Sequence, residues 1–313
     1  MKRGIIQSRG LGDILIALPI AWHYYQRGDE IHWPICQEFL PSFVEAAPWV
    51  KWHGIATDSR GEFFVEGPIR VFKANGVDPA AALYLYHYLN TQPQMTNPEL
   101  FNILKFDQYK YAVAQVPFVN KWRLSECVTR NPATELAFKQ SLNLPDRYNV
   151  VHLKGSSMSV DLAALGSVLD PAVPIVEITE ISNSIFDWLS VIEGAEACVC
   201  IDSVYANLID QMGVTGPKLY WIRRSPWDLT PVLGQDWTVI PTTLPIVEPT
   251  RVDPAVEARK LKERLAGGAS PGQPQPNMRA ATAPGSGQTG LASHVPFKAA
   301  GNIPTSFMSA LKK

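Results

Sequence analysis

The stretch that most constrains the fold lies near the N-terminus and reads Ser8-Arg9-Gly10-Leu11-Gly12-Asp13-Ile14-Leu15. A strand-like segment, Gly4 to Gln7, precedes it, and apolar residues at helical spacing follow it as far as Ala21. A strand, a glycine-bearing turn and the start of a helix predict a site where backbone N–H groups and the positive helix end face a ligand. We call residues 8–13 the opening elbow.

Asp13 gives this elbow a carboxylate, and two interpretations of it carry equal weight. An aspartate at the start of a helix often caps the first free N–H groups. A carboxylate held on a rigid turn beside a cleft can also act as a catalytic base. The residues of the elbow alone do not choose between a cap and a base.

Length and composition predict a protein with substantial cores. A chain of 313 residues that is 46% apolar fits one large or two medium domains. The net charge of −1 divides into −6 for residues 1–263 and +5 for residues 264–313. Five scattered cations in the last segment favour a solvated tail over a weak contact with a polyanion or a protein.

The four cysteines show no metal-ligand spacing and are expected to be reduced, small core residues. The N-terminal apolar stretch is interrupted by Gly10, Gly12 and Asp13, so it is a poor signal peptide. No apolar run reaches the roughly 18–20 residues that span a bilayer. These features predict a soluble, cytoplasmic protein, with a peripheral position at the inner face of the membrane as a variant of that location.

Two series of alternating strands and helices predict an α/β protein with mostly parallel sheets. The first series occupies residues 1–54, and the second runs from Asn149 to Ile222. A helix from Asn131 to Leu142, ended by Asn143-Leu144-Pro145, precedes the boundary between them. We therefore expect an N-terminal domain of residues 1–145, a C-terminal domain of 146–250, a helical segment of 251–266, and a disordered or strap-like Pro/Gly/Ser-rich tail of 267–313.

The region between the two series is less regular. Residues 63–65 and 69–72 are expected to form strands, and residues 79–89 an aromatic-rich helix. Within that helix the side chains of Tyr84, Tyr86, His87 and Tyr88 either line an acceptor site or pack beneath a long loop. Packing is the favoured interpretation.

Two turns in the second series suit a phosphate group. After the strand ending at Leu153, the turn places Lys154, Ser156 and Ser157 near a glycine. After an apolar strand ending at Ile201, Asp202-Ser203 begins a helix, where capping and ligand contact are compatible roles. The carboxyl ends of strands are where open α/β sheets bind ligands.

Several other chemistries lack their sequence patterns. The chain has no GxxxxGK[ST] loop, no GxSxG elbow, no HExxH and no pair of histidines at i, i+4. The first turn also lacks GxGxxG, which disfavours a Rossmann-type epimerase or dehydrogenase. We therefore expect neither a metal nor a tightly bound cofactor.

With these segments in place, the chain resembles glycosyltransferase family 9, the ADP-heptose:lipopolysaccharide heptosyltransferase type. Ser8 to Pro19 resembles the opening motif of that family almost position by position. The later run Ile178-Thr179-Glu180-Ile181-Ser182, a helix, Gly194-Ala195-Glu196, a strand and Asp202-Ser203 resembles its donor-binding half. The resemblance covers most of residues 1–240.

The resemblance implies a GT-B fold, in which two Rossmann-like doubly wound domains face each other across a cleft. It implies an inverting transfer of a sugar from a nucleotide-sugar donor to an acceptor hydroxyl, with Asp13 as general base. Donor and substrate contacts are implied for Arg9, Gly10 and Gly12 on the first half, and for Lys154, Ser156, Ser157, Glu180, Asp202, Ser203 and Asn207 on the second.

The implied acceptor is an envelope glycan or a lipid-linked sugar, with a hydroxylated DNA base as the less common alternative. The chain also departs from the second motif of the family, which normally continues Asp-[Ser/Thr]-Gly-x-x-His. Val204 stands in place of the glycine and Asn207 in place of the histidine. These changes support the alternative of a GT-B-like binding or structural protein without turnover.

Overall fold

The computed structural model describes residues 1–57, 61–87, 97–155, 159–165, 168–179, 182, 184–223 and 230–240. All of them belong to one compact unit, Met1–Val247. The expected helical segment 251–266 and the expected tail 267–313 lie outside the described residues. Their structure stays a prediction, and so does the division of the chain into domains at residue 145.

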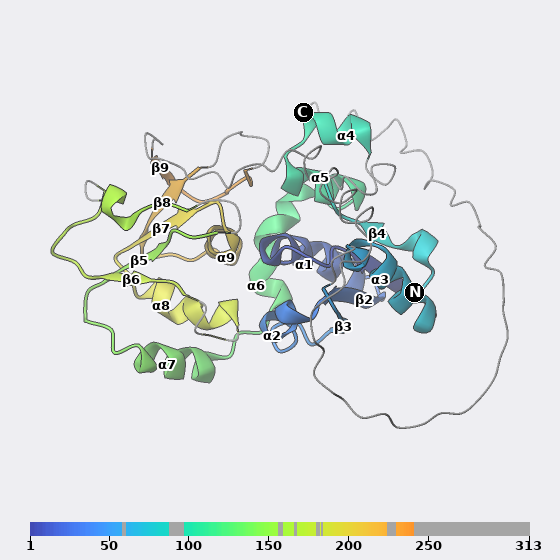
Figure 1. Cartoon of the computed structure of the whole chain (residues 1–313), viewed down its shortest axis with the longest axis horizontal. Coiled ribbons are helices and arrows are strands. Elements are labelled where there is room, and N and C mark those ends of the chain that lie inside the picture. The colour runs from blue at the N-terminus through green and yellow to red at the C-terminus, as the bar shows by residue number, and fades with distance from the viewer. Residues whose placement is uncertain are drawn as a thin grey trace, which may run out of the picture. The chain divides into compact units, whose positions relative to one another are not determined.

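The first half of this unit contains a parallel sheet and a series of short helices (Figure 1). In chain order its elements are β1 (Lys2–Ile6), α1 (Leu11–Tyr25), β2 (Glu30–Cys36), η1 (Gln37–Phe39), α2 (Leu40–Phe43), β3 (Val50–Ile55), η2 (Glu62–Phe64), α3 (Glu66–Ala74), η3 (Pro79–Ala81), β4 (Leu83–Tyr84), α4 (Pro98–Ile103), α5 (Phe106–Val113), η5 (Phe118–Arg123), α6 (Leu124–Cys127) and α7 (Pro132–Ser141). The η elements are 3₁₀ helices. The predicted helix from Asn131 is confirmed as α7, which Asn131 caps by accepting the Thr134 N–H at 3.2 Å.

The second half repeats the pattern with fewer helices. Its elements are β5 (Asn149–His152), η6 (Leu162–Leu165), β6 (Ile175–Glu177), η7 (Ile185–Trp188), α8 (Leu189–Glu193), β7 (Ala197–Ile201), α9 (Val204–Met212), β8 (Lys218–Ile222) and β9 (Thr238–Ile240). The strands predicted between residues 149 and 222 are all present. The helix expected between the first two strands of this series appears in the described residues only as the short η6.

Both sheets are parallel throughout the described residues. Their strand orders are β3-β2-β1-β4 and β6-β5-β7-β8-β9. The expected α/β class, with two parallel sheets as in a GT-B fold, is therefore confirmed. In each sheet the first strand lies inside the sheet, so the strand order reverses at β1 and at β5. Ligands of open α/β sheets bind at the carboxyl edge beside such a reversal.

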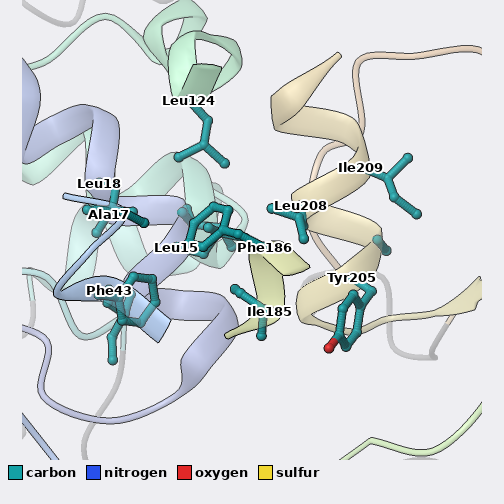
Figure 2. Packing of buried hydrophobic residues seen from close by; sticks show 14 of the residues in the cluster. Leu15, Ala17, Leu18, Phe43, Leu124, Ile185, Phe186, Tyr205, Leu208 and Ile209 are labelled. Carbon is teal, nitrogen blue, oxygen red and sulfur yellow. The ribbon is translucent and has the colours of Figure 1, made fainter. Parts of the chain in front are cut away.

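Helix α1 lies at the centre of the molecule because it is apolar on every side. Residues Ile14–Ala21 are buried without interruption, as expected for a helix enclosed by protein all round. Leu15 and Leu18 of α1 belong to the same hydrophobic cluster as Phe186 of η7 and Leu208 of α9 (Figure 2). The two halves thus share one core, and this core fixes the starts of α1 and α9 relative to each other.

A segment between β8 and β9 of the second sheet is hydrogen-bonded to helices of the first half. Asp107 and Lys121 form an ion pair of 2.7 Å in which both side chains are fully buried. Asp107 also accepts the Val232 N–H at 2.7 Å, and Lys121 donates to the Val232 carbonyl. Since a buried backbone group must be paired, these contacts hold the chain at residue 232 in one position.

The strands predicted over residues 63–65 and 69–72 are wrong. Residues 62–64 form η2, and residues 66–74 form α3. The buried residues of α3 are Gly67, Pro68 and Phe72, and Val65 just before the helix is buried as well. Val65, Pro68 and Phe72 have the i, i+3, i+7 spacing of one helix face. The aromatic and β-branched composition suggested a strand, and burial against the first sheet outweighed that preference.

The helix predicted over residues 79–89 is also wrong where the structure describes it. Asp78 caps the single turn η3, and Leu83–Tyr84 then pairs with Ile5–Ile6 of β1 as the edge strand β4. Tyr84 and Tyr86 alternate with a period of two, the spacing of a strand. Residues 88 and 89 lie outside the described ranges.

Candidate functional site

Asp13 lies in the first turn of α1 and does not cap that helix. The helix begins at Leu11, and the position before it is Gly10, which has no side chain to offer. The interpretation of Asp13 as a helix cap is therefore wrong. A carboxylate in the first turn is nevertheless favoured by the positive end of the helix.

The Asp13 carboxylate is paired with Lys110, a residue that the sequence analysis missed. The Lys110 Nζ lies 2.9 Å from Asp13 Oδ1, and the lysine side chain is 1% exposed while the aspartate is 37% exposed. Lys110 Nζ also donates to Gln7 Oε1 at 2.8 Å and to the Leu85 carbonyl at 3.0 Å. Three acceptors therefore surround the three N–H donors of one buried ammonium group.

Gly10 leaves room for the second oxygen of Asp13. The Gly10 backbone has φ of +85°, and a Cβ atom placed on it would lie 2.5 Å from Asp13 Oδ2. Both features exclude a side chain at this position, because L-residues rarely adopt positive φ and the contact is below van der Waals distance. The elbow therefore requires glycine at residue 10 for two reasons: the positive φ of its backbone, and the space that the Asp13 side chain occupies.

We expect Gly10→Ala to destabilise the fold by about 1–2 kcal/mol, the cost of one residue in the left-handed region. It should also displace the Asp13 carboxylate, so a reaction rate that depends on Asp13 should fall by more than the loss of folded protein explains. Urea unfolding and steady-state kinetics measure the two effects. Gly28→Ala is the matched control, because Gly28 has φ of +89° and nothing within 4 Å of the added Cβ. Equal activity in the two variants would contradict the displacement of Asp13.

The backbone that leads into the elbow is held by Tyr86. The Tyr86 hydroxyl accepts the N–H groups of Ser8 and Arg9, each at 3.0 Å, and lies 2.8 Å from Ser8 Oγ. Ser8 Oγ in turn donates to the Phe63 carbonyl. Burial raises the pKa of Tyr86, so the hydroxyl stays protonated. Tyr86 thus packs beneath the elbow, as the favoured interpretation of these tyrosines expects.

Arg9 lies on the exposed side of the same turn. Its guanidinium stands 5.1 Å from the centre of the Phe63 ring, and its carbonyl accepts the Gln7 side-chain N–H at 2.7 Å. The charged end of Arg9 thus lies against an aromatic face.

The elbow meets the second half at the start of α9. A Cβ atom placed on Gly12 would lie 3.5 Å from the Val204 Cα, so the two chain segments are in contact there. Ser203 caps α9 by accepting the Ala206 N–H at 3.5 Å, and Asp202 accepts the Trp221 indole N–H at 2.5 Å. The structure therefore brings together the predicted residues of the elbow and those around Asp202.

Asn207 is 4% exposed and lies in the first turns of α9. Its Nδ2 donates to the Ser203 carbonyl at 3.0 Å, whereas its Oδ1 finds no hydrogen-bond partner among the described residues. Buried polar atoms are normally hydrogen-bonded, so this oxygen is an unsatisfied acceptor within the described residues.

The turn after β5 holds the remaining predicted residues. Lys154 is 76% exposed and lies 3.5 Å from Glu177 Oε1 on the neighbouring strand. Ser156, Ser157 and Glu180, the other predicted contacts of this half, lie outside the described residues. The roles of these four residues as donor contacts stay predictions.

His152, at the carboxyl end of β5, is a residue that the sequence analysis did not single out. Its ring lies 4.8 Å from the Tyr205 ring, and its Nδ1 is buried with no partner in the described part of the chain. Burial lowers the pKa of His152 to about 4. The imidazole is therefore neutral near pH 7 and adds no cation to the second half.

The lowered pKa of His152 predicts a loss of stability in acid. Between about pH 6.5 and 4 the unfolded chain binds a proton that the folded chain excludes, so stability falls as the pH falls through this window. We expect the free energy of unfolding to lose about 2–3 kcal/mol from this residue between pH 7.5 and 4.5. Urea unfolding of the wild type and His152→Asn measures it, and an identical pH dependence in the two proteins would contradict it.

The described residues contain neither a cluster of metal-ligating side chains nor a helix that could cross a membrane. No three His, Cys, Asp or Glu side chains within the described ranges form a group able to hold a metal ion. None of the helices that the structure describes is both long and apolar enough to cross a membrane.

No family model and no curated protein sequence matches the chain. Among solved structures, a glycosyl transferase family 9 protein from Veillonella parvula DSM 2008 is similar, with 12% identity over 76% of this chain and 86% of that chain and a TM-score of 0.49. The E. coli ADP-heptose LPS heptosyltransferase II has 13% identity over 85% and 99% of the two chains, with a TM-score of 0.47. The E. coli heptosyltransferase WaaC with ADP has 12% identity over 85% and 98%, with a TM-score of 0.45. The function of this chain therefore has to follow from its own residues.

Proposed function

We propose that this protein is an inverting glycosyltransferase, which moves a sugar from a nucleotide-sugar donor to an acceptor hydroxyl with Asp13 as general base. The observation that carries the proposal is the placement of Asp13. Its carboxylate lies on the elbow at the strand reversal of the first sheet, and the preceding residue, Gly12, contacts the start of α9 in the second half. The resemblance of Ser8 to Pro19 to the opening motif of family 9 supports the same role.

The chemistry needs one carboxylate and one good leaving group. The acceptor oxygen attacks the anomeric carbon while its proton passes to Asp13, and the bond from that carbon to the donor phosphate oxygen breaks. A single displacement inverts the anomeric centre and leaves a nucleoside diphosphate. A positioned base contributes roughly 10²–10⁴-fold to such a step.

The charge that develops on the leaving diphosphate has to be stabilised by the second half. The start of α9 offers the positive end of a helix, beside the Asn207 amide. Lys154, with Ser156 and Ser157, is the further candidate for contact with the phosphates, and Glu180 for contact with the nucleoside or sugar. In this proposal the reaction proceeds without a metal ion.

The proposed acceptor is a hydroxyl of an envelope glycan or lipid-linked sugar, used in the cytoplasm or at the inner face of the membrane. A hydroxylated DNA base is the alternative, to which the cations of residues 264–313 would add weak attraction.

A second candidate is a GT-B-like protein that binds a nucleotide sugar or a glycan without turnover. The observation that favours it is the contact between Gly12 and Val204, because Val204 occupies the position where the family pattern has a glycine. A valine side chain there limits how closely a ligand can approach the backbone of α9.

A panel of nucleotide sugars and nucleoside diphosphates, tested by thermal unfolding, decides between these functions. A ligand at 100 times its dissociation constant should stabilise the protein by about 2.7 kcal/mol. Stabilisation followed by release of nucleoside diphosphate supports the transferase. Stabilisation without release, for every donor and acceptor tried, supports a protein that binds a nucleotide sugar without turnover. A panel with no effect contradicts both the transferase and nucleotide-sugar binding.

A further inference from the structure

We infer that Lys110 is a positioning residue, which fixes one oxygen of Asp13 and leaves the other free to take the acceptor proton. The inference rests on the proposed function, since it assigns a role within the same reaction. It concerns a residue of α5, far along the chain from the elbow, for which the resemblance to family 9 implied no role.

The position of the Lys110 ammonium is set by the first sheet and not by Asp13. One of its acceptors is the Leu85 carbonyl, just after β4, and another is Gln7 Oε1, just after β1. Gln7 is 1% exposed, and its own N–H group donates to the Arg9 carbonyl. Lys110 therefore has a fixed location to which the Asp13 side chain must conform.

The two oxygens of Asp13 consequently have different surroundings. Oδ1 accepts from Lys110 at 2.9 Å, whereas Oδ2 lies over Gly10, in space that a side chain at residue 10 would fill. The carboxylate is 37% exposed and the ammonium 1%. A substrate can therefore reach the aspartate side chain but not the lysine, and with Oδ1 held by Lys110 we assign the acceptor proton to Oδ2.

A comparison with the second buried lysine separates this arrangement from a purely structural ion pair. Lys121 and Asp107 are both fully buried, so neither group of that pair is open to a ligand. The pair of Lys110 and Asp13 is closed on the side of the lysine and open on the side of the aspartate. A general base needs this asymmetry, because one carboxylate oxygen is fixed by a buried donor while the other can react with the substrate.

The charge of Lys110 is tested by Lys110→Gln, which keeps N–H donors for its neighbours. If wild-type protein transfers a sugar, the variant should retain its affinity for nucleoside diphosphate and lose roughly 10–100-fold in kcat, the cost of a misplaced catalytic group. Lys121→Gln is the matched control, also a buried lysine paired with an aspartate. It should lose stability and keep kcat when assayed below its unfolding temperature.

A second readout requires no activity. Asp13→Ala leaves the buried ammonium without its carboxylate, so it should lower Tm by roughly 4 °C or more in the wild-type background. In the Lys110→Gln background the same change should lower Tm by less than half as much. Equal losses in the two backgrounds would overturn the coupling between Lys110 and Asp13.

The outcomes of these two tests are distinguishable. Wild-type protein without turnover on any donor defeats the proposed function, and the Tm comparison then decides whether Lys110 holds Asp13. Wild-type turnover together with unchanged kcat in Lys110→Gln leaves the proposed function standing and overturns the positioning role.

Discussion

Asp13→Asn should lower kcat for sugar transfer by roughly 10²–10⁴-fold, the usual contribution of a general base. The amide has nearly the same size, and its oxygen can still accept from Lys110, so the fold and the elbow should persist. An amide does not take up a proton at neutral pH, so the acceptor hydroxyl loses its base. The affinity for nucleoside diphosphate should stay the same, because that ligand is assigned to the second half.

The control for this variant is Glu99→Gln, which neutralises an exposed carboxylate in the first turn of another helix, α4. Glu99 should be replaceable without effect on kcat. Steady-state rates with saturating donor measure both variants. An Asp13→Asn enzyme as fast as Glu99→Gln would show that the base is another residue.

Asp107→Ala should lower the free energy of unfolding by about 3–5 kcal/mol, the largest stability effect that we expect from a single substitution here. The change leaves the fully buried Lys121 ammonium without its counter-charge. It also removes the acceptor of the Val232 N–H, so the segment that joins the second sheet to the helices of the first half loses a fixed contact.

Two comparison variants isolate the cause of that loss. Asp107→Leu combined with Lys121→Met removes both charges and should recover the part of the loss that comes from the unpaired ammonium, because an apolar pair needs no desolvation of ions. Arg123→Ala breaks an exposed pair with Glu126 and should barely move the urea midpoint. If Asp107→Ala behaved like Arg123→Ala, the buried pair would not be a determinant of the fold.

The sequence predicted the elbow and the second sheet because their local patterns agree with their tertiary placement. The glycines at residues 10 and 12 mark a turn between a strand and a helix, and Ala197–Ile201 is apolar throughout, as a strand buried on both faces should be. Ser203 was expected at a helix start and is found there as a cap. In these segments no distant contact had to overrule the local preference.

Residues 62–87 were predicted poorly because distant contacts decide their structure. Phe72 packs over Gly4 of β1, where a Cβ atom would lie 2.7 Å from the Phe72 ring, and this contact requires α3 to cross the sheet. Leu83–Tyr84 becomes a strand through pairing with β1. The period of two in the tyrosines was the one local indication of that strand.

Lys110 could not be predicted from its own segment. A lysine on a short helix is ordinarily solvated, and only the tertiary fold places it behind the elbow with Gln7 and Leu85. Tyr86 is a similar case, since its role as a clamp for Ser8 and Arg9 depends on the position of β4. Polar residues that support a site from distant segments show no sequence spacing that would connect them with the residues of that site.

The stereochemistry of the first-formed product tests the central claim most directly. Wild-type protein and Asp13→Asn are incubated with each nucleotide sugar that stabilises the fold, and the anomeric signals of the transferred or hydrolysed sugar are followed by proton NMR. We predict that the wild type releases nucleoside diphosphate and first forms the anomer inverted relative to the donor, while Asp13→Asn forms it at least roughly 10²-fold more slowly. A product with retained configuration, or equal rates for the two proteins, would contradict a single displacement with Asp13 as the base.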